Sequence, residues 1–317
     1  MFNKFDVVIV NWNSDIQLKD CIRSIMDSSF DHELLNKVVV VDNDSKDQSI
    51  EMAESLNFKK LRVIKNKENL GFGKACNIGA ENSTADFILF LNPDAMVYED
   101  TFSKLFSYIK DNNTDSISVY GVKLIGDAKK TQRSCARFPK LHNFLIRVIG
   151  LNKLNSKIFK TYHMEDWDHD ESRFVDHVIG AFYFIDRTIF KLVNGFDERY
   201  FVYFEDLDLS KKVQEADKKV YYLAGASAYH KGGGTSEQVK ALRFFYSRKS
   251  SLIYSFKHLG SIRSFIFISF VYFVEPITRT MFLLLKRSPV KEYIELYKGF
   301  FMLYKDTFNI FKLGLKK

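Results

Sequence analysis

One acidic turn follows an apolar segment directly, where its carboxylate could bind a metal ion. Residues 87–91 are all apolar, and the chain then turns at Asn92, Pro93 and Asp94. A diphosphate leaving group needs its charge neutralised, and Mg²⁺ or Mn²⁺ held by hard oxygen ligands such as the Asp94 carboxylate can do this. Asn92 would add an amide oxygen or orient the turn. The alternative is a turn that only takes the chain out of a sheet, a common use of these residues.

A second acidic cluster, in "YFEDLDLSKKV", places Glu205, Asp206 and Asp208 at or near a helix start. The positive end of a helix dipole stabilises an ionised carboxylate, the form that a general base requires near neutral pH. The same dipole favours acidic residues in any first turn, so helix stabilisation alone is the alternative interpretation.

A histidine stands at a comparable position in "ASAYHKGGGTS". His230 follows a strand-like segment and precedes three glycines, 232–234, which could close over an anion. Neutral imidazole is also a good partner for Mn²⁺ beside a carboxylate. A lone histidine with ordinary hydrogen bonds at the surface or in the core is the alternative.

The segment "VVVVDNDSKDQS" could contact a nucleotide. Asp42 ends a β-branched run and could accept hydrogen bonds from a base or ribose. Ser45 and Gln48 behind it have the spacing of a capping box for the next helix, which is the structural alternative. Both interpretations can hold together, because such a cap does not use Asp42.

Glycines shape the next connection, "NKENLGFGKACNIGA". Gly71 and Gly73 suit a loop in which the backbone approaches a phosphate or ribose at a helix N-terminus. The motif is not a dinucleotide-binding GxGxxG, because its third glycine, Gly79, comes too late. A tight turn explains the same glycines without any ligand.

Alternating strand and helix patterns must position these residues. The patterns predict strands at 5–10, 37–42, 61–65 and 86–91, and helices near 15–27, 46–57 and 73–82. This order predicts a doubly wound parallel sheet with right-handed crossovers. Ligands of such sheets bind beyond the carboxyl ends of the strands, where Asn11, Asp42, Asn66 and Asp94 fall.

The rest of the chain is less regular and then helical. A strand is expected at 116–125, whereas 126–175 is mixed and remains unassigned. Strand and helix signals return at 177–193, and from about 236 the chain is helical and rich in Phe, Leu, Ile and Lys.

Composition limits the class of protein. A chain of 317 residues with 46% apolar and 27% charged residues can bury one large core or two modest ones. Its 3 cysteines lack a CxxC pattern, which argues against a disulfide framework or thiolate zinc site and fits a reducing cytoplasm. The N-terminus lacks the pattern of a signal peptide. The net charge of +8 permits a nucleotide, a nucleic acid or a membrane surface as partner.

Six motifs follow one another in order: "VVIVNWN", "VVVVDNDSKD", "NLGFGKACNIGA", "LFLNPDA", "GAFYFIDRTIFKLVNGFDERYFVYFEDLDLSKKV" and "AYHKGGG". Together they resemble the family 2 glycosyltransferases of the GT-A fold, most closely the bacterial rhamnosyltransferase-like branch. The resemblance spans roughly 5–235 and is poor from 126 to 175. It implies an α/β GT-A fold, a doubly wound, mostly parallel sheet flanked by helices. It also implies a nucleotide-sugar-binding and catalytic domain at 1–235 and a helical extension at 236–317.

The resemblance also implies a role for each matching residue. Asn11, Asp42, Asn69 and Gly71 would form the nucleotide pocket. Asp94 matches the last carboxylate of the family's metal-binding DxD motif, and His230 matches the histidine that completes the metal site. This chain has Asn92 where the motif has its first Asp, and the lost carboxylate weakens the site electrostatically.

In the acidic cluster, Asp206 matches the family's catalytic base. It would take a proton from an acceptor hydroxyl as that oxygen attacks the anomeric carbon, a single displacement that inverts configuration. Glu205 would support it, and Asp208 would support it or hydrogen-bond the acceptor.

The function implied is that of an inverting cytoplasmic glycosyltransferase in cell-surface polysaccharide synthesis. The donor would be a dTDP- or UDP-sugar, with L-rhamnose from dTDP-rhamnose expected from the branch, and the acceptor a saccharide or lipid-linked glycan. A non-catalytic nucleotide-sugar-binding subunit is the alternative, with Asn92 as a sign of lost metal chemistry. A nucleotidyltransferase would need a glycine-rich, lysine-bearing motif after the first strand, which is missing. Nucleic acid is not expected as a partner, because the first half has no basic stripe with interleaved aromatics.

The apolar stretch 264–274 lies between Arg263 and Glu275 and is too short to span a membrane, for which about 20 residues are needed. It would pack on the catalytic domain or lie on the inner face of the cell membrane as a peripheral contact. In the second case basic side chains would face anionic lipid. These are Lys257, Arg263, Arg279, Lys286 and Arg287.

Overall fold

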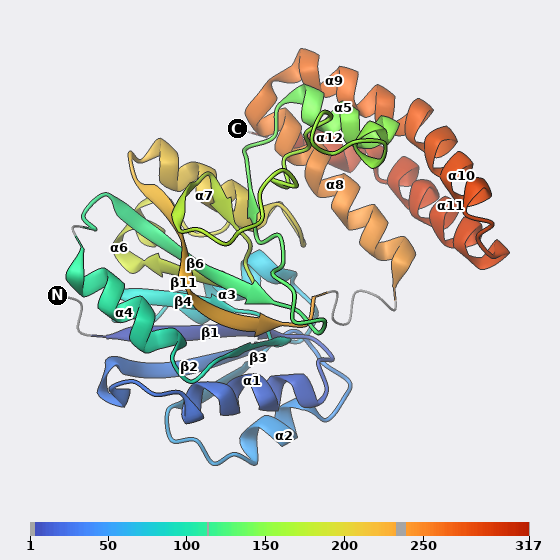
Figure 1. Cartoon of the computed structure of the whole chain (residues 1–317). Coiled ribbons are helices and arrows are strands. Elements are labelled where there is room, and N and C mark those ends of the chain that lie inside the picture. The colour runs from blue at the N-terminus through green and yellow to red at the C-terminus, as the bar shows by residue number, and fades with distance from the viewer. Residues whose placement is uncertain (1–3, 113, 233–238, 317) are drawn as a thin grey trace. The chain divides into compact units, whose positions relative to one another are not determined.

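The computed structural model describes residues 4–112, 114–232 and 239–316. The chain divides into two compact units, coloured along the chain in Figure 1. The first unit comprises Met1–Ala136, Asp168–Glu198 and Glu205–Thr235, and the second comprises Arg137–Trp167, Arg199–Phe204 and Ser236–Lys317. Two segments that precede residue 235 therefore group with the C-terminal helices. The functional division into 1–235 and 236–317 stays a prediction.

A single large sheet runs through the first unit. Across the described sheet the order is β3 (Leu61–Lys65), β2 (Leu35–Asp42), β1 (Phe5–Asn11), β4 (Phe87–Leu91), β10 (Phe182–Asp186), β6 (Ile117–Ile125), β11 (Lys219–His230) and β5 (Ala95–Val97), and β8 (Arg173–Val175) also pairs with β11. A separate pair joins β7 (Cys135–Ala136) to β9 (His177–Val178).

Strand direction in this sheet is mixed. The strands β1 to β4 are parallel, as predicted from the alternating pattern. Strand β10 is antiparallel to both of its neighbours, β4 and β6, and β6 and β11 are parallel again. The α/β sheet flanked by helices agrees with the prediction, and its parallel arrangement is interrupted where β10 enters the centre in the reverse direction.

The central strands β1, β2 and β4 contain apolar runs, 7–10, 38–41 and 87–91, because helices cover both faces of the sheet. Val7 and Ile9 of β1 belong to the core that includes Leu18 of α1 (Ile16–Asp27). The intervening Val8 faces α3 (Phe72–Ala80), which approaches so closely that a Cβ added to Gly79 would lie 2.4 Å from the Cγ1 of Val8. Other helices of this unit are α2 (Ser49–Glu54), α4 (Thr101–Asp111), α6 (Arg187–Leu192) and α7 (Glu205–Glu215).

The second unit consists mainly of helices packed around α8. Its helices are α5 (Leu141–Ile149), α8 (Lys240–Leu259), α9 (Ser261–Ser269), α10 (Glu275–Leu285), α11 (Val290–Lys305) and α12 (Thr307–Leu315), with a π-helical turn at Phe270–Val274. Phe144 of α5 stacks on Phe267 of α9, with ring centroids 4.5 Å apart. This packing explains why 137–167 belongs to the helical unit.

A buried ion cluster lies inside this unit. Arg248 contacts Glu275 Oε1 through Nε at 2.9 Å and through Nη2 at 2.6 Å, and the Nε of Arg279 contacts the same oxygen at 2.7 Å. Burial alone would raise the pKa of Glu275, but the two guanidinium groups outweigh it and the pKa is lowered. Arg279 is thus engaged by Glu275 and not free to face lipid, contrary to the prediction.

The apolar stretch around 264–274 belongs to a longer helix than predicted. Residues Ser261–Leu285 form one helical span of 25 residues, with a mean hydropathy of 1.4 over its apolar window and 17% of that window buried. By length and composition it could cross a membrane, so the inference that the stretch is too short to span was wrong. The apolar segment continues past Glu275 because the two arginines neutralise its charge.

Candidate active site

The predicted site residues of the first unit gather beyond the carboxyl ends of neighbouring strands. Asn11 and Asp42 face one another as the last paired residues of β1 and β2. The turn at Asn92–Asp94 follows β4, which pairs with β1 on its other side. His230 ends β11 and pairs with Ala95, the residue after Asp94. These four residues are therefore brought to one edge by strand pairing alone.

Asp42 is held in place by its neighbours. Its Oδ1 accepts from Asn11 Nδ2 at 2.8 Å and from the Ser45 hydroxyl at 2.5 Å, and its Oδ2 accepts from the Ser45 amide at 3.2 Å. The predicted capping box of Ser45 and Gln48 was wrong. Gln48 is itself the N-cap position of α2 and makes no side-chain cap, while Ser45 binds Asp42.

The Asn11 side chain makes its hydrogen bonds within the protein. It is fully buried, and its amide also donates to Ser49 Oγ at 2.8 Å. The arrangement therefore orients Asp42, which keeps 5% of its surface exposed. The nucleotide contact predicted for Asn11 would be indirect, through Asp42.

The glycine loop is tied to the same edge. Gly71 takes φ 85° and ψ 170°, a conformation that favours glycine, and its amide donates to Asn69 Oδ1 at 3.0 Å. Asn43 Nδ2 donates to the Gly71 carbonyl at 3.1 Å, and Asn66 Nδ2 donates to Asn43 Oδ1 at 2.8 Å. This chain of amides joins the ends of β2 and β3 to the start of α3, so Asn69 and Gly71 lie beside the Asp42 edge.

Asp94 and His230 form the second part of the site. His230 Nε2 lies 3.4 Å from Asp94 Oδ1, and both side chains are 10% exposed. Gln132, which the sequence did not single out, fixes this histidine from behind. Its Nε2 donates to the His230 carbonyl at 2.6 Å, so its Oε1, 2.9 Å from Nδ1, accepts from a protonated Nδ1. Nε2 is then the ring nitrogen that faces the Asp94 carboxylate.

This pair has the donors of a partial metal site. Ligand atoms side by side on a divalent cation, each at ~2.1 Å, lie about 3 Å apart, close to the Asp94–His230 separation. Within the part of the chain that the structure describes, no group of three or more His, Cys, Asp or Glu could hold a metal. Among the described residues, the Asn92 side chain forms no hydrogen bond. Because Asn92 is two residues before Asp94, its amide oxygen could join the same site. Of the predicted glycine loop, residues 233 and 234 lie outside the described residues.

Asp206 lies in the first turn of α7 and is held by two backbone amides. Leu207 N donates to its Oδ1 and Gly180 N to its Oδ2, each at 2.8 Å. Its side chain is 19% exposed, more than the 10% of Asp94, so part of the carboxylate is accessible from outside. Directly before α7, Tyr203 and Phe204 both take φ 69°, a backbone conformation that is uncommon for residues other than glycine. These two residues set the direction in which the chain enters α7.

The two acidic neighbours of Asp206 point inward. Glu205 is 4% exposed, and burial, with Asp206 beside it, raises its pKa well above the usual value, which favours its protonated form. A neutral Glu205 leaves the negative charge of the pair on Asp206. Asp208 has no exposed surface, so the prediction that it could hydrogen-bond the acceptor was wrong. Helical geometry turns residues 205 and 208 to the same inward face.

A buried polar chain lies below Asp206. His177 Nε2 is 3.7 Å from Asp206 Oδ2, and its Nδ1 is 2.9 Å from the hydroxyl of Ser210, which also contacts the Tyr183 hydroxyl at 3.0 Å. Burial lowers the pKa of His177 and keeps it neutral, although Asp206 acts in the opposite direction. The only sequence signal for His177 was its place beside the apolar run 178–185.

One short segment connects the base to the metal turn. Gly180 N binds Asp206, and the carbonyl of the next residue, Ala181, accepts from Asn92 N at 3.1 Å. Residues 180 and 181, which directly precede β10, therefore bind Asp206 and the Asn92–Asp94 turn through adjacent backbone groups. Proton acceptance and diphosphate binding can be served by one site.

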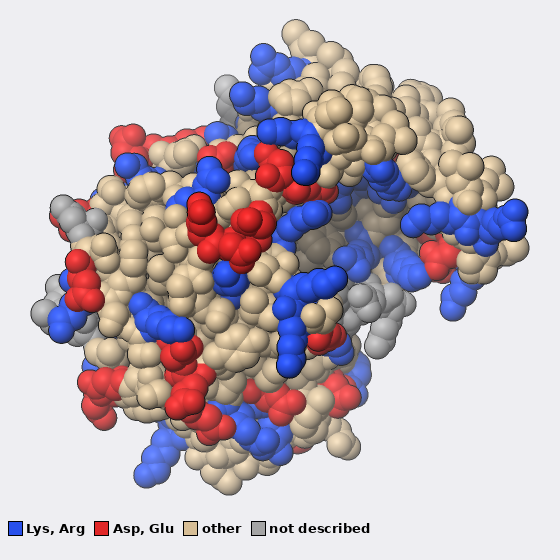
Figure 2. Space-filling model, viewed as in Figure 1, with Lys and Arg blue, Asp and Glu red and all other residues tan. Residues whose placement is uncertain are grey.

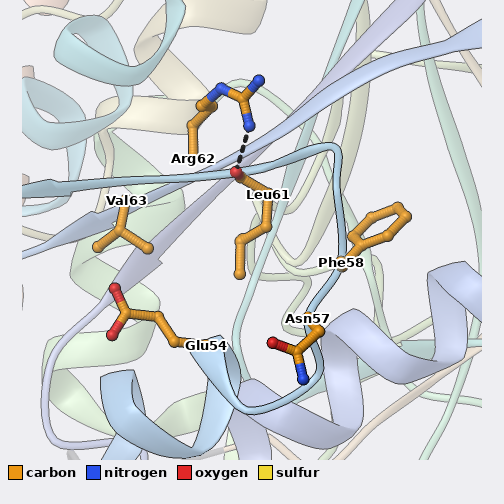
Figure 3. Close-up of a pocket in the computed structure, with 6 residues that line it drawn as sticks. All are labelled: Glu54, Asn57, Phe58, Leu61, Arg62 and Val63. Carbon is orange, nitrogen blue, oxygen red and sulfur yellow. Dashed lines mark hydrogen bonds between the residues drawn. The ribbon is translucent and has the colours of Figure 1, made fainter.

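A surface hollow elsewhere in this unit is not this site. It has a volume of ≈ 310 Å³ and is lined by Glu54, Asn57, Phe58, Leu61, Arg62 and Val63 (Figure 3). It lies where β3 begins, whereas the candidate residues lie where the strands end. Its one polar contact drawn joins Arg62 to the Leu61 carbonyl at 2.7 Å, and none of the predicted site residues lines it.

Known proteins resemble this chain in sequence and in fold. The model of glycosyl transferase family 2 matches residues 6–182. Rhamnosyltransferase WbbL of Escherichia coli K12 is 31% identical over 191 residues, 59% of this chain and 68% of that protein. An N-acetylglucosaminyl-diphospho-decaprenol L-rhamnosyltransferase of Mycobacterium tuberculosis is 24% identical over 229 residues, 68% of this chain and 73% of that one.

Solved structures confirm the architecture. Residues 1–349 of Staphylococcus aureus TarS, in complex with UDP-GlcNAc, match with a TM-score of 0.55 at 18% identity, covering 98% of this chain and 83% of that one. The mannosyltransferase PcManGT of Pyrobaculum calidifontis, in complex with GDP-Man and Mn²⁺, matches with a TM-score of 0.53 at 14% identity, covering 98% and 84%. At these identities the likeness shows the fold alone. With the family model covering more than half of the chain, the protein belongs to glycosyl transferase family 2 and is a glycosyltransferase.

Proposed function

We propose that the protein transfers L-rhamnose from dTDP-rhamnose to a saccharide or lipid-linked glycan, with inversion, at the cytoplasmic face of the membrane during cell-surface polysaccharide synthesis. Two relatives named as rhamnosyltransferases support the donor, and the decaprenol-linked substrate in the name of one supports the acceptor class. The observation that carries the chemistry is the attachment of Asp206 and the Asn92–Asp94 turn to adjacent residues, Gly180 and Ala181.

Asp206 is the base in this proposal. Its carboxylate accepts the proton of an acceptor hydroxyl while that oxygen bonds to the anomeric carbon and the bond from that carbon to the diphosphate breaks. The amides of Gly180 and Leu207 fix the direction of the carboxylate, and each of its oxygens keeps a lone pair for the incoming proton. Attack opposite the leaving group inverts the configuration.

Asp42, Asn69 and Gly71 bind the nucleotide, with Asn11 holding Asp42. Asp94 and His230 hold a divalent cation, Mg²⁺ or Mn²⁺, with Asn92 orienting the turn; this ion would neutralise the departing diphosphate. Since no group of three or more His, Cys, Asp or Glu among the described residues could hold a metal, the ligands besides Asp94 and His230 would come from the diphosphate and water.

Donor hydrolysis tests the proposal without a known acceptor. Purified protein is incubated with a panel of dTDP- and UDP-sugars, with and without Mn²⁺, and free nucleoside diphosphate is measured. Metal-dependent release from dTDP-rhamnose is expected. Preferential turnover of a UDP-sugar would overturn the donor assignment. Tight nucleotide binding with no turnover of any donor, even with lipid-linked acceptors added, would favour a non-catalytic binding subunit.

A further inference from the structure

The long helix Ser261–Leu285 carries an exposed apolar stripe along its whole length. From Phe265 onward, its exposed residues are uncharged, and the one basic side chain of this part, Arg279, is 38% exposed and bound to Glu275. The exposed residues are Phe265, Ile266, Ser269, Phe273, Ile277, Met281, Leu284 and Leu285. The most open are Leu285 at 78% and Phe273 at 74%. Steps of three and four residues keep this set on one side of the helix.

A second stripe runs along α11 and into α12. Its members, Val290, Ile294, Tyr297, Phe301, Tyr304 and Phe308, are again three or four residues apart and between 44% and 82% exposed. The two stripes belong to neighbouring helices, because Tyr304 OH donates to the Tyr272 carbonyl at 2.7 Å and Thr280 Oγ1 lies 2.8 Å from Tyr297 OH. They form one surface, called here the apolar face. Soluble surfaces rarely leave contiguous apolar area of this extent uncovered.

The charges around the apolar face are predominantly basic. Between 261 and 317 the sequence has ten Lys and Arg against four Asp and Glu. Glu275 is buried against two arginines, and the other three acids are half-buried and paired: Glu292 binds Lys240, Glu295 binds Lys298, and Asp306 binds Lys249. The exposed basic residues are Arg263, Lys286, Arg287, Lys291, Lys298, Lys305, Lys312 and Lys316.

The lysines follow a regular order beside the second stripe. Lys291, Lys298 and Lys305 recur every seven residues, which places them in one row flanking the apolar residues of α11. Figure 2 shows a broad uncharged area on the helical unit with Lys and Arg at its borders. An apolar face with a basic border is the pattern of a helix pair lying in a membrane interface.

The opposite side of the long helix is fixed within the helical unit. Glu275 is buried against Arg248, and Thr278 Oγ1 donates to the Val148 carbonyl at 2.8 Å. Phe267 stacks on Phe144. Crossing a bilayer would expose the Arg248–Glu275 pair to hydrocarbon or leave Glu275 without its partners, and both are costly. The helix therefore keeps its protein contacts and offers only its outer side.

We propose that the apolar face docks in the interface of an anionic lipid bilayer, with the helices parallel to the membrane surface and the row Lys291, Lys298 and Lys305 against lipid headgroups. A second copy of this chain fits the face poorly, since it would bring two basic borders together. The inference rests on the surface of the helical unit and not on the donor or the acceptor of the reaction.

Vesicle flotation of the full chain tests this. The vesicles contain phosphatidylcholine alone or with about a third phosphatidylglycerol, and 0.5 M salt provides a further condition. The wild type should float with anionic vesicles and less at high salt. Changing Lys291, Lys298 and Lys305 to Gln should lower partitioning on the order of 100-fold on anionic vesicles, at about fivefold per lysine, with little change on neutral ones.

The apolar contribution is tested with Phe273→Gln, Ile277→Gln and Phe308→Gln combined. These side chains are 62–82% exposed, so the fold should survive, and partitioning should fall at least 10-fold on both kinds of vesicle. Leu192→Gln, at a 66% exposed leucine of the first unit, is the matched control and should float as the wild type does. Unchanged thermal unfolding verifies each variant.

Three results would overturn the proposal. If the wild-type protein stays at the bottom of the gradient with every kind of vesicle, it does not bind a lipid surface. Self-association that the apolar variant abolishes, without flotation, would assign the face to a second copy of the chain. Protein that floats but resists extraction by alkaline carbonate spans the bilayer rather than lying on it.

Discussion

Replacing Gln132 with Ala should weaken metal binding although Gln132 itself contacts no metal. Its amide makes two hydrogen bonds to one residue, to the His230 carbonyl at 2.6 Å and to the ring Nδ1 at 2.9 Å. Together they set both the position and the tautomer of the imidazole that faces Asp94. Groups that orient a metal-binding histidine contribute roughly 10- to 100-fold to metal affinity. We therefore expect a loss of about 1.4–2.7 kcal/mol in Mn²⁺ binding.

The assay is a titration of free Mn²⁺ by electron paramagnetic resonance, with dTDP present. Gln214→Ala, at an exposed glutamine of α7, is the control and should bind Mn²⁺ as the wild type does. In a His230→Ala background, Gln132→Ala should cost less than about twofold more, because the histidine that it orients is gone. Unchanged affinity in the single variant, or an equal loss in both backgrounds, would refute the role assigned to Gln132.

Three further predictions concern stability. Glu205 has a raised pKa in the fold, so the folded state keeps a proton that the unfolded chain loses. The free energy of unfolding of the wild type should therefore fall as pH rises above about 4.5, by up to ~1.4 kcal/mol per pH unit. Glu205→Gln should remove this slope in urea titrations from pH 5 to 8. Arg248→Ala should cost about 3–5 kcal/mol in urea unfolding, because it leaves the Glu275 charge buried without its main partner; a cost under ~1 kcal/mol would mean that Arg279 suffices. Gly79→Ala should cost ~1–3 kcal/mol because its Cβ would meet Val8, and combining it with Val8→Ala should cost less than the sum of the two changes.

Much of the fold could be predicted because its signals are local. Strands β1, β2 and β4 are covered on both faces and so contain apolar runs of four or five residues, and the helices between them require parallel crossovers. The position of Asp42 and Asp94 at one edge follows from that topology. The reversed insertion of β10 could not be predicted, because it depends on pairing with β4 and β6, far away in the chain.

The candidate site was predictable where residues stand in motifs and hidden where they act through distant partners. Gln132 contacts His230 across 98 positions, within a stretch that has no regular pattern. The burial of Asn11 and Asp208 was also invisible in the sequence, since a polar residue at a strand end or helix start looks available until its neighbours are known. Similarly, the 25-residue helix looked short because Glu275 marks its middle as polar, and only Arg248 and Arg279 reveal that this charge is neutralised.

The most direct test of the account compares donor turnover and nucleotide binding in the wild type and in Asp206→Asn. Asn has nearly the shape of Asp but cannot accept the acceptor's proton, and loss of a general base typically costs about 10²- to 10⁴-fold in rate. We expect turnover of the sugar nucleotide to fall by that factor, with dTDP affinity within about threefold of the wild type and thermal unfolding unchanged. A variant that keeps more than about a tenth of the wild-type rate would contradict the assignment of Asp206 as the catalytic base.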